Sequence, residues 1–92
     1  MSEPFQIAET EAFAKVIAQD RSLSKVYRKI TDYVYPILRQ NPFFGPNIKR
    51  LKGALSAYHR YRIGDYRLFY KIDNEKVIVF IISLVPRKSA YK

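Results

Sequence analysis

The first half of the chain opens with a short alternating segment and continues with helical spacing. Apolar and polar residues alternate over Phe5-Gln6-Ile7, which predicts a short first strand. Thr10 is a suitable helix N-cap, and the apolar residues that follow it recur at helical spacing. We therefore expect a first helix that begins after Thr10 and ends near Gln19.

A longer amphipathic stripe follows. Ser22 and Ser24 are both suitable caps, and apolar residues then recur at spacings of three and four: Leu23, Val26, Tyr27, Ile30, Val34, Ile37 and Leu38. This pattern predicts a second helix that forms a hairpin with the first. Pro36 falls inside the pattern, so a kink or an early end is expected there.

The segment from Asn41 to Asn47 contains two prolines and a glycine, which predicts a loop. Phe43 and Phe44 lie within it. Large aromatic side chains gain most from burial, so we expect both rings to pack under the core.

The second half has the period of β-structure. Residues 58–63 and 66–72 alternate on either side of Gly64-Asp65, which predicts a hairpin with a two-residue turn. The continuous apolar run from Lys76 to Val85 is typical of a central strand covered on both faces, and Pro86 ends it. The expected order is β-α-α-β-β-β in one domain, residues 1–92: an α+β fold with a helical hairpin packed on an antiparallel sheet.

The hairpin can be paired from its turn. Side chains alternate along a strand, so this pairing places six residues on one side, two rings among four cations: Tyr58, Arg60, Arg62, Arg67, Phe69 and Lys71. His59 falls on the other, mainly apolar side, where a satisfied core histidine is the expected role. Arg62 lies opposite Arg67, and like charges in that position are destabilising. Phosphate would neutralise them, and the rings can stack on bases. The alternative is a merely solvated face, and a one-residue slip would scatter the set.

Charge supports a polyanionic partner. The net charge is +9. Residues 1–45 carry six Lys or Arg against five Asp or Glu, whereas residues 46–92 carry eleven against three. RNA, DNA or an acidic protein segment fits this distribution.

Composition excludes several classes of site. The chain has no cysteine and one histidine, which excludes a disulfide framework, a cysteine zinc site and a multi-histidine metal site. The sequence has no cluster of acidic residues that could hold a metal ion, and we expect no cofactor. No segment has the pattern of a membrane span or a signal peptide. We therefore expect a cytoplasmic protein.

Together these residues resemble the RelE/ParE toxin superfamily. The most specific parts are Leu51-Lys52-Gly53, the block from Arg60 to Tyr70 containing Gly-Asp-Tyr-Arg, and the ending Arg87-Lys88-Ser89-Ala90-Tyr91. The resemblance covers nearly the whole chain. It implies a small α/β toxin held inactive by a cognate antitoxin, and RelE-like members cut mRNA in the ribosomal A site.

The resemblance also implies roles for individual residues. Arg67 matches the sheet arginine that contacts the scissile phosphate, and Arg87 matches a second arginine that helps the leaving oxygen. Tyr91 matches the C-terminal tyrosine that stacks on a base or assists proton transfer. Lys52 and Lys88 are expected to add to phosphate binding on the basic face.

The match departs from the family at Arg60 and Arg62, where RelE-like members often have lysines. Arginine does not lose its proton at ordinary pH, so neither residue can be the general base. Tyr91, Lys71 or solvent remain as acceptors for the 2′-hydroxyl proton. The expected mechanism is electrostatic and independent of metal, with preorganised cations stabilising the charged transition state.

Three functions remain open at this point. The first is a ribosome-dependent mRNA endoribonuclease that inhibits translation. The second is a ParE-like toxin that poisons DNA gyrase, and the third is a non-catalytic RNA-binding module. In the toxin readings, the antitoxin should be acidic where it meets the sheet.

Overall fold

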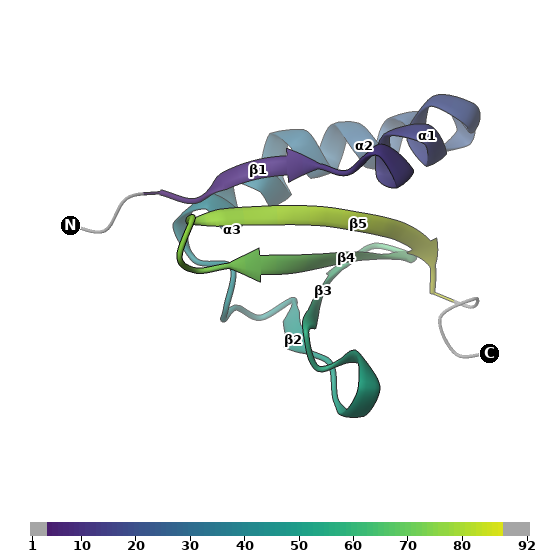
Figure 1. Ribbon diagram of the computed structural model, residues 1–92. Helices are drawn as coiled ribbons and strands as arrows, with labels where there is room; N and C mark the ends of the chain where they lie inside the picture. The colour runs from purple at the N-terminus through teal and green to yellow at the C-terminus, as the bar shows by residue number, and fades with distance from the viewer. Residues whose placement is uncertain (1–3, 88–92) are drawn as a thin grey trace.

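The computed structural model describes residues 4–87 and has a five-stranded sheet with helices on one face (Figure 1). The sheet order is β1-β5-β4-β3-β2. The strands are β1 (Gln6–Glu9), β2 (Ile48–Arg50), β3 (Tyr58–Ile63), β4 (Tyr66–Asp73) and β5 (Ile78–Pro86). The helices are α1 (Glu11–Gln19), α2 (Ser24–Lys29) and α3 (Tyr35–Gln40), with shorter helical segments η1 (Arg21–Leu23), η2 (Ile30–Val34) and η3 (Gly53–Leu55).

The expected α+β class and the helical hairpin on one face of the sheet are confirmed. Two details differ. The sheet is mixed rather than antiparallel, because β1 pairs in parallel with β5, Gln6 opposite Ile78. The chain that joins these two strands includes the helical hairpin and the strands β2, β3 and β4, so it is long enough for parallel pairing. In addition, β2 adds a strand that was not expected, since three residues are too short to show an alternation.

The run from Lys76 to Val85 is also placed differently. It forms β5, which lies between β1 and β4, and the middle position of the sheet belongs to β4. Only one face of β5 is fully covered: Val79, Ile81 and Leu84 are buried, while Phe80 and Ile82 are half-buried. A bulge explains the spacing of three between Ile81 and Leu84. The register with β4 shifts there, so both side chains still reach the core.

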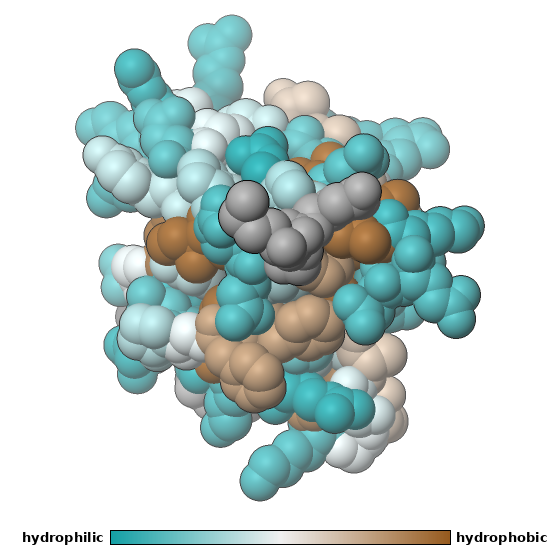
Figure 2. Space-filling view, turned by 90° about the vertical axis from the view of Figure 1, so that its left-hand side faces the viewer, coloured by the Kyte–Doolittle hydropathy of each residue, from teal (hydrophilic) through white to brown (hydrophobic). Residues whose placement is uncertain are grey.

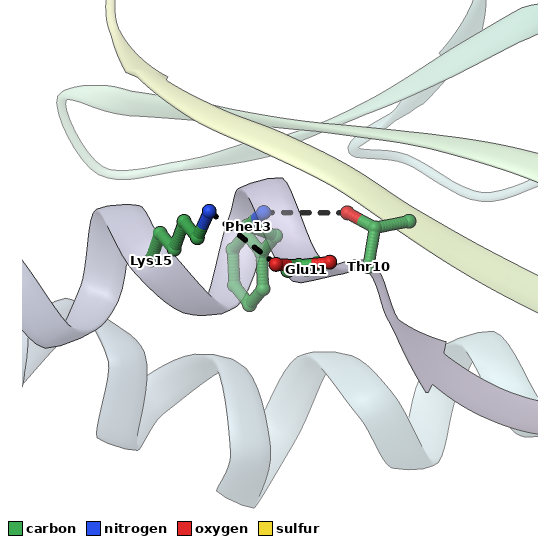
Figure 3. Close-up of polar contacts among 4 residues, drawn as sticks. All are labelled: Thr10, Glu11, Phe13 and Lys15. Carbon is green, nitrogen blue, oxygen red and sulfur yellow. Dashed lines mark hydrogen bonds and ion pairs between the residues drawn. The ribbon is translucent and has the colours of Figure 1, made fainter.

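Thr10 begins α1 as expected (Figure 3). Its Oγ1 accepts a hydrogen bond from the Phe13 amide at 3.3 Å and donates one to the Ile81 carbonyl at 2.7 Å. One hydroxyl therefore caps the helix and ties it to β5. Lys15 and Glu11 form an exposed ion pair of 3.3 Å on the same helix.

The second helical stripe is continuous from Arg21 to Gln40 but changes its winding before Pro36. The Tyr35 amide donates to the Ile30 carbonyl, five residues back, in the wider turn of η2. A wider turn gives room to a proline ring that would otherwise strike the carbonyl four residues earlier. The helix therefore passes Pro36 and does not end there.

The core lies between the helices and the sheet. Fully buried side chains come from both layers, with Phe13, Ile30 and Leu38 from the helices and Leu68 and Tyr70 from the sheet. The buried Tyr70 hydroxyl donates to the Pro42 carbonyl at 2.8 Å, which anchors the 41–47 loop.

That loop contains one correction. Phe43 is half-buried and packs edge-on to Phe5, with ring centroids 5.8 Å apart. Phe44, which was expected under the core, is 79% exposed. Two adjacent residues cannot both turn inward in an extended loop, and Phe43 occupies the inner position.

Candidate nucleic-acid interface

The register of the central hairpin matches the pairing read from its turn. Ile63 faces Tyr66, Arg62 faces Arg67, Arg60 faces Phe69, and Tyr58 faces Lys71. Gly64 has φ of 55°, and no non-glycine residue near it has positive φ. This is the pattern of a type II′ turn, whose twist suits two tightly paired strands.

The pairing separates two faces. Tyr61, Leu68 and Tyr70 point to the helices and are buried in the core. The alternate residues therefore lie on the face away from the helices, which we call the basic face: Tyr58, Arg60, Arg62, Arg67, Phe69 and Lys71. All six expected residues share this face.

The structure adds Lys49 to the basic face. Lys49 of β2 stands directly opposite Arg60, so it shares that side of the sheet. A row then runs across four strands, with Phe69 and Ser83 beyond Arg60. Sequence reasoning missed Lys49 because β2 was not expected. The pair of basic residues at 49–50, directly before Leu51-Lys52-Gly53, was the available signal.

Three arginines gather at the hairpin-turn end of the basic face. Arg62 and Arg67 are opposite each other, and the Arg87 amide donates to the Asp65 carbonyl in the turn at 2.7 Å. This hydrogen bond holds the backbone of Arg87 beside the turn, and Arg87 is the residue that the resemblance matches to a second arginine of the site.

The β2–β3 side of the basic face is held by Asn47. Its carbonyl accepts from the Arg62 amide at 2.9 Å and from the Arg60 Nη1 at 3.3 Å. The Arg60 guanidinium is thereby oriented by backbone, which reduces the conformational entropy that phosphate binding would cost.

The aromatic members of the basic face border a pocket of about 230 Å³, the sheet pocket. Its lining is Leu51, Leu55, Tyr58, Phe69, Ile82 and Ser83. The Lys71 ammonium lies 4.7 Å from the centre of the Tyr58 ring, a cation–π contact that fixes the ring beside the cations. Lys52 is exposed in the connection between the two leucines of the pocket. An apolar, ring-lined pocket next to guanidinium groups can hold a base while its phosphate is bound alongside.

Two expected site residues, Lys88 and Tyr91, lie outside the described residues. Their expected roles in phosphate binding and proton transfer stay predictions.

His59 is on the helix side of the sheet, as the alternation predicts, but it is not a satisfied core histidine. Its ring stacks on Tyr70 with centroids 5.6 Å apart, and its buried Nδ1 has no hydrogen-bond partner. Burial, and then the positive charge of Arg50, lower the pKa of His59 below its ordinary value. The imidazole is therefore neutral near pH 7, and it stands away from the basic face.

Within residues 4–87, no group of three or more His, Cys, Asp or Glu side chains is placed to hold a metal ion. In the same range, no helix is both long and apolar enough to cross a membrane.

Comparison with known proteins decides the family. The family model for the ParE toxin of the type II toxin–antitoxin system parDE matches residues 7–91. This chain belongs to the ParE toxin family. A curated relative of this ParE-family toxin is the protein named Toxin RelE of Mycobacterium tuberculosis (strain ATCC 25618 / H37Rv), 31% identical over 90 residues, which are 97% of this chain and 88% of that one. The RelE/ParE resemblance is thus confirmed.

Solved structures agree on the fold. The toxin–antitoxin complex RelBE2 from Mycobacterium tuberculosis contains a chain with a TM-score of 0.77 and 22% identity, over 95% of each chain. The RelE–RelB complex from Pyrococcus horikoshii OT3 gives a TM-score of 0.69 at 25% identity, over 91% of this toxin and 96% of that chain. The YoeB/ParE toxin from Agrobacterium tumefaciens gives a TM-score of 0.72 at 18% identity, over 89% of this toxin and 98% of that chain.

Proposed function

We propose that this ParE-family toxin is a ribosome-dependent mRNA endoribonuclease that inhibits translation. The observation that carries the proposal is the basic face, where Arg62 and Arg67 stand opposite each other and share the face with Arg60, Lys71 and two aromatic rings. Two guanidinium groups so placed can bind one phosphate together, and the like charges across the ladder make an anionic ligand favourable. The RelE name of the 31% identical relative supports the same reading.

The chemistry is an internal phosphoryl transfer. The 2′-oxygen of a ribose attacks the adjacent phosphorus and forms a new P–O bond, while the bond from phosphorus to the 5′-oxygen of the next nucleotide breaks. The products are a 2′,3′-cyclic phosphate and a free 5′-hydroxyl. The 2′-hydroxyl proton passes to a base, and the leaving oxygen gains a proton. No redox partner or metal is required for this balance.

The residues contribute mainly charge and position. In the proposed arrangement, Arg67 binds the scissile phosphate and Arg87 stabilises the leaving oxygen, and the negative charge of the transition state is met by groups already in place. Arg60, Arg62 and Lys49 bind neighbouring phosphates. Neither arginine on β3 can accept the proton. We assign proton transfer to Tyr91, with Lys71 or solvent as the alternatives.

The ribosome enters the proposal because the sheet pocket beside the basic face is small. The sheet pocket, at about 230 Å³, holds one base and does not enclose an RNA segment. A scaffold that presents one strained mRNA phosphate to the face would supply the missing orientation. Free RNA should then be cut slowly.

The proposed silencing partner is a cognate antitoxin. Three of the similar solved chains come from toxin–antitoxin complexes. They are RelBE2 from Mycobacterium tuberculosis, RelE–RelB from Pyrococcus horikoshii OT3 and RelB–RelE from Methanococcus jannaschii. An antitoxin segment that covers the basic face should be acidic, because buried cations without partners would weaken the complex.

A second candidate function is poisoning of DNA gyrase. The matching family model is that of ParE, and the lysines common in RelE-like members are replaced by Arg60 and Arg62. These two observations favour the gyrase reading, whereas the cluster of Arg62, Arg67 and Arg87 with aromatic rings nearby favours RNA cleavage.

Induction of the toxin in bacteria separates the two functions. We would map mRNA 5′ ends in cells that express the wild-type chain, Arg67→Ala, or Lys25→Ala, a matched loss of one exposed cation from α2. New ends within translated regions that appear with wild type and Lys25→Ala but not with Arg67→Ala support the ribonuclease. Growth arrest with unchanged mRNA ends and accumulating cleaved DNA–gyrase complexes would contradict it.

A further inference from the structure

A second pocket lies on the side of the sheet away from the basic face. This edge pocket has a volume of about 440 Å³ and is lined mainly by Phe43, Phe44, Arg50, Ser56, His59 and Ile72. None of these residues has a role in the proposed cleavage site.

The position of the edge pocket follows from strand register. Arg50 of β2 stands directly opposite His59 of β3, on the side of the sheet that faces the helices. His59 and Arg62 are three residues apart along β3, about 10 Å at the rise of a strand, and they point to opposite faces. Figure 2 views the molecule from the end at which β4 ends and β5 begins. There, moderately hydrophobic surface lies exposed among projecting hydrophilic side chains.

The polar wall of the edge pocket is an oriented guanidinium group. The Arg50 Nε donates to the Ser56 carbonyl at 3.1 Å. This bond fixes the plane of the group and leaves its two terminal nitrogens for a ligand. Among the residues that line the pocket there is no carboxylate. The wall is therefore suited to an anion, and a phosphate oxygen matches the guanidinium geometry.

The rest of the edge pocket is aromatic and rigid. His59 stacks on the buried Tyr70, and Phe43 meets His59 edge-on with centroids 6.3 Å apart. The Nδ1 atom of His59 is buried, so a molecule in the pocket would contact the imidazole through the other atoms of the ring. Phe44, at the rim, is 79% exposed and offers a free ring face. Exposed rings beside cations are the platforms on which unpaired bases stack.

The two cations of β2 join the edge pocket to the basic face. Lys49 points to the basic face, opposite Arg60, and the next residue, Arg50, points to the pocket. The strand lies at the edge of the sheet, so these two residues place positive charge on both sides of that edge. A single strand of nucleic acid that crosses Lys49 can thus reach Arg50.

We propose that the edge pocket binds one unstacked nucleotide of single-stranded RNA, with the base on Phe44 and its phosphate on Arg50. It is a subsite for RNA outside the cleavage site, and it extends the proposed function because it takes the same class of ligand. An aromatic residue beside an acidic residue in a protein partner is the competing occupant. The continuity of cations from the basic face favours RNA.

The single histidine of the chain provides the reporter. We would titrate the full-length Arg67→Ala protein with adenosine 5′-monophosphate, adenosine and ribose 5-phosphate, and follow the His59 ring signals by NMR. Arg67→Ala removes the proposed catalytic contact and limits competition from the basic face. The monophosphate should shift the signals saturably and bind at least about tenfold more tightly than either fragment, because stacking and charge act together.

Matched variants locate the site. Phe44→Ser and Arg50→Gln change exposed residues, and each should weaken binding of the monophosphate by about tenfold. Tyr33→Ser and Lys25→Gln remove an exposed ring and an exposed cation from the helices and should change affinity less than about twofold. Circular dichroism of all four variants checks that the fold is kept.

Three results would overturn the proposal. The first is no shift of the His59 signals with the monophosphate, and the second is an equal loss of affinity in the control variants. The third is tighter binding of N-acetyl-aspartyl-phenylalanine amide than of the monophosphate, which would assign the pocket to a protein partner. The proposed cleavage function is tested separately, by mRNA cutting with the residues of the basic face intact. If Phe44→Ser toxin loses the nucleotide but still cuts mRNA, both proposals stand and the subsite is a binding accessory that cleavage does not need. If wild type binds the nucleotide but never cuts, only the cleavage proposal fails.

Discussion

Arg62 and Arg67 stand directly opposite each other on the basic face. A substitution in this pair should change stability and RNA binding in opposite directions. Arg62→Gln should stabilise the free protein by about 0.2–1 kcal/mol, because it removes like-charge repulsion across the ladder. The same change should weaken RNA binding and make it less dependent on salt, since one phosphate contact is lost. Urea unfolding and RNA titration at two salt concentrations measure both effects.

Lys25→Gln is the control for the Arg62 prediction. It removes one exposed cation from α2 and should leave stability and salt dependence nearly unchanged. A loss of stability in Arg62→Gln would mean that the opposed arginines are compatible in the free protein. The argument that this pair favours a bound phosphate would then fail.

Glu9 ties the first strand to the helices through two tyrosines. Its carboxylate accepts from the Tyr27 hydroxyl at 2.8 Å and from the Tyr35 hydroxyl at 2.7 Å. Tyr35→Phe should therefore cost about 1.5 kcal/mol at pH 7, the value of a hydrogen bond to a charged group. Tyr33→Phe, at a 68% exposed ring, should cost little. Urea unfolding measures the difference.

The same cluster predicts a sensitivity to alkali. Burial, and then the hydrogen bond and charge of Glu9, raise the pKa of Tyr27 from 10.0 to about 12. Burial and Glu9 also raise the pKa of Tyr35. The folded protein then holds these protons more tightly than the unfolded chain. Stability should be complete below pH 10 and fall as the pH rises through about 12. Tyr35→Phe should flatten this fall, and an unchanged slope would contradict the assignment.

At the scale of elements, the hairpin of β3 and β4 sets the register of the basic face. Gly64 has φ of 55°, a conformation that other residues adopt only with strain. Gly64→Ala should destabilise the protein by about 1 kcal/mol, while Gly64→Asn should cost less because asparagine tolerates this conformation. Thermal unfolding of the two variants gives the comparison. Equal costs would show that the turn is not held in this geometry.

The elements differ in how well the sequence predicts them. The hairpin and its pairing could be predicted because Gly64-Asp65 fixes the turn and the turn fixes every pair that follows. Thr10 likewise marks the start of α1. By contrast, β2 has three residues and no periodic pattern, and the parallel pairing of β1 with β5 is a contact between the two ends of the chain. Neither is encoded by local spacing.

At the scale of the whole molecule, positive charge gathers on one face of the sheet and at one of its edges. The helices cover the apolar face, so cations of the second half of the chain collect on the other side and at the β2 edge. The members of the basic face that lie on the hairpin could be predicted because alternation alone assigns them. Lys49 could not, because it depends on β2. The exposure of Phe44 and the unpartnered Nδ1 of His59 depend on packing among distant segments, which no local pattern records.

The measurement that tests the central proposal most directly is cleavage of mRNA on a purified ribosome complex. A complex stalled with an empty A site would be mixed with wild-type toxin, Arg67→Ala or Lys25→Ala, and the same mRNA without ribosomes would run in parallel. The proposal predicts one cut in the A-site codon, with 2′,3′-cyclic phosphate and 5′-hydroxyl ends. Arg67→Ala should slow the cut at least about a hundredfold, as loss of one group that stabilises transition-state charge does, and Lys25→Ala should not. Intact mRNA on the ribosome, or equal cutting by wild type and Arg67→Ala, would contradict the account.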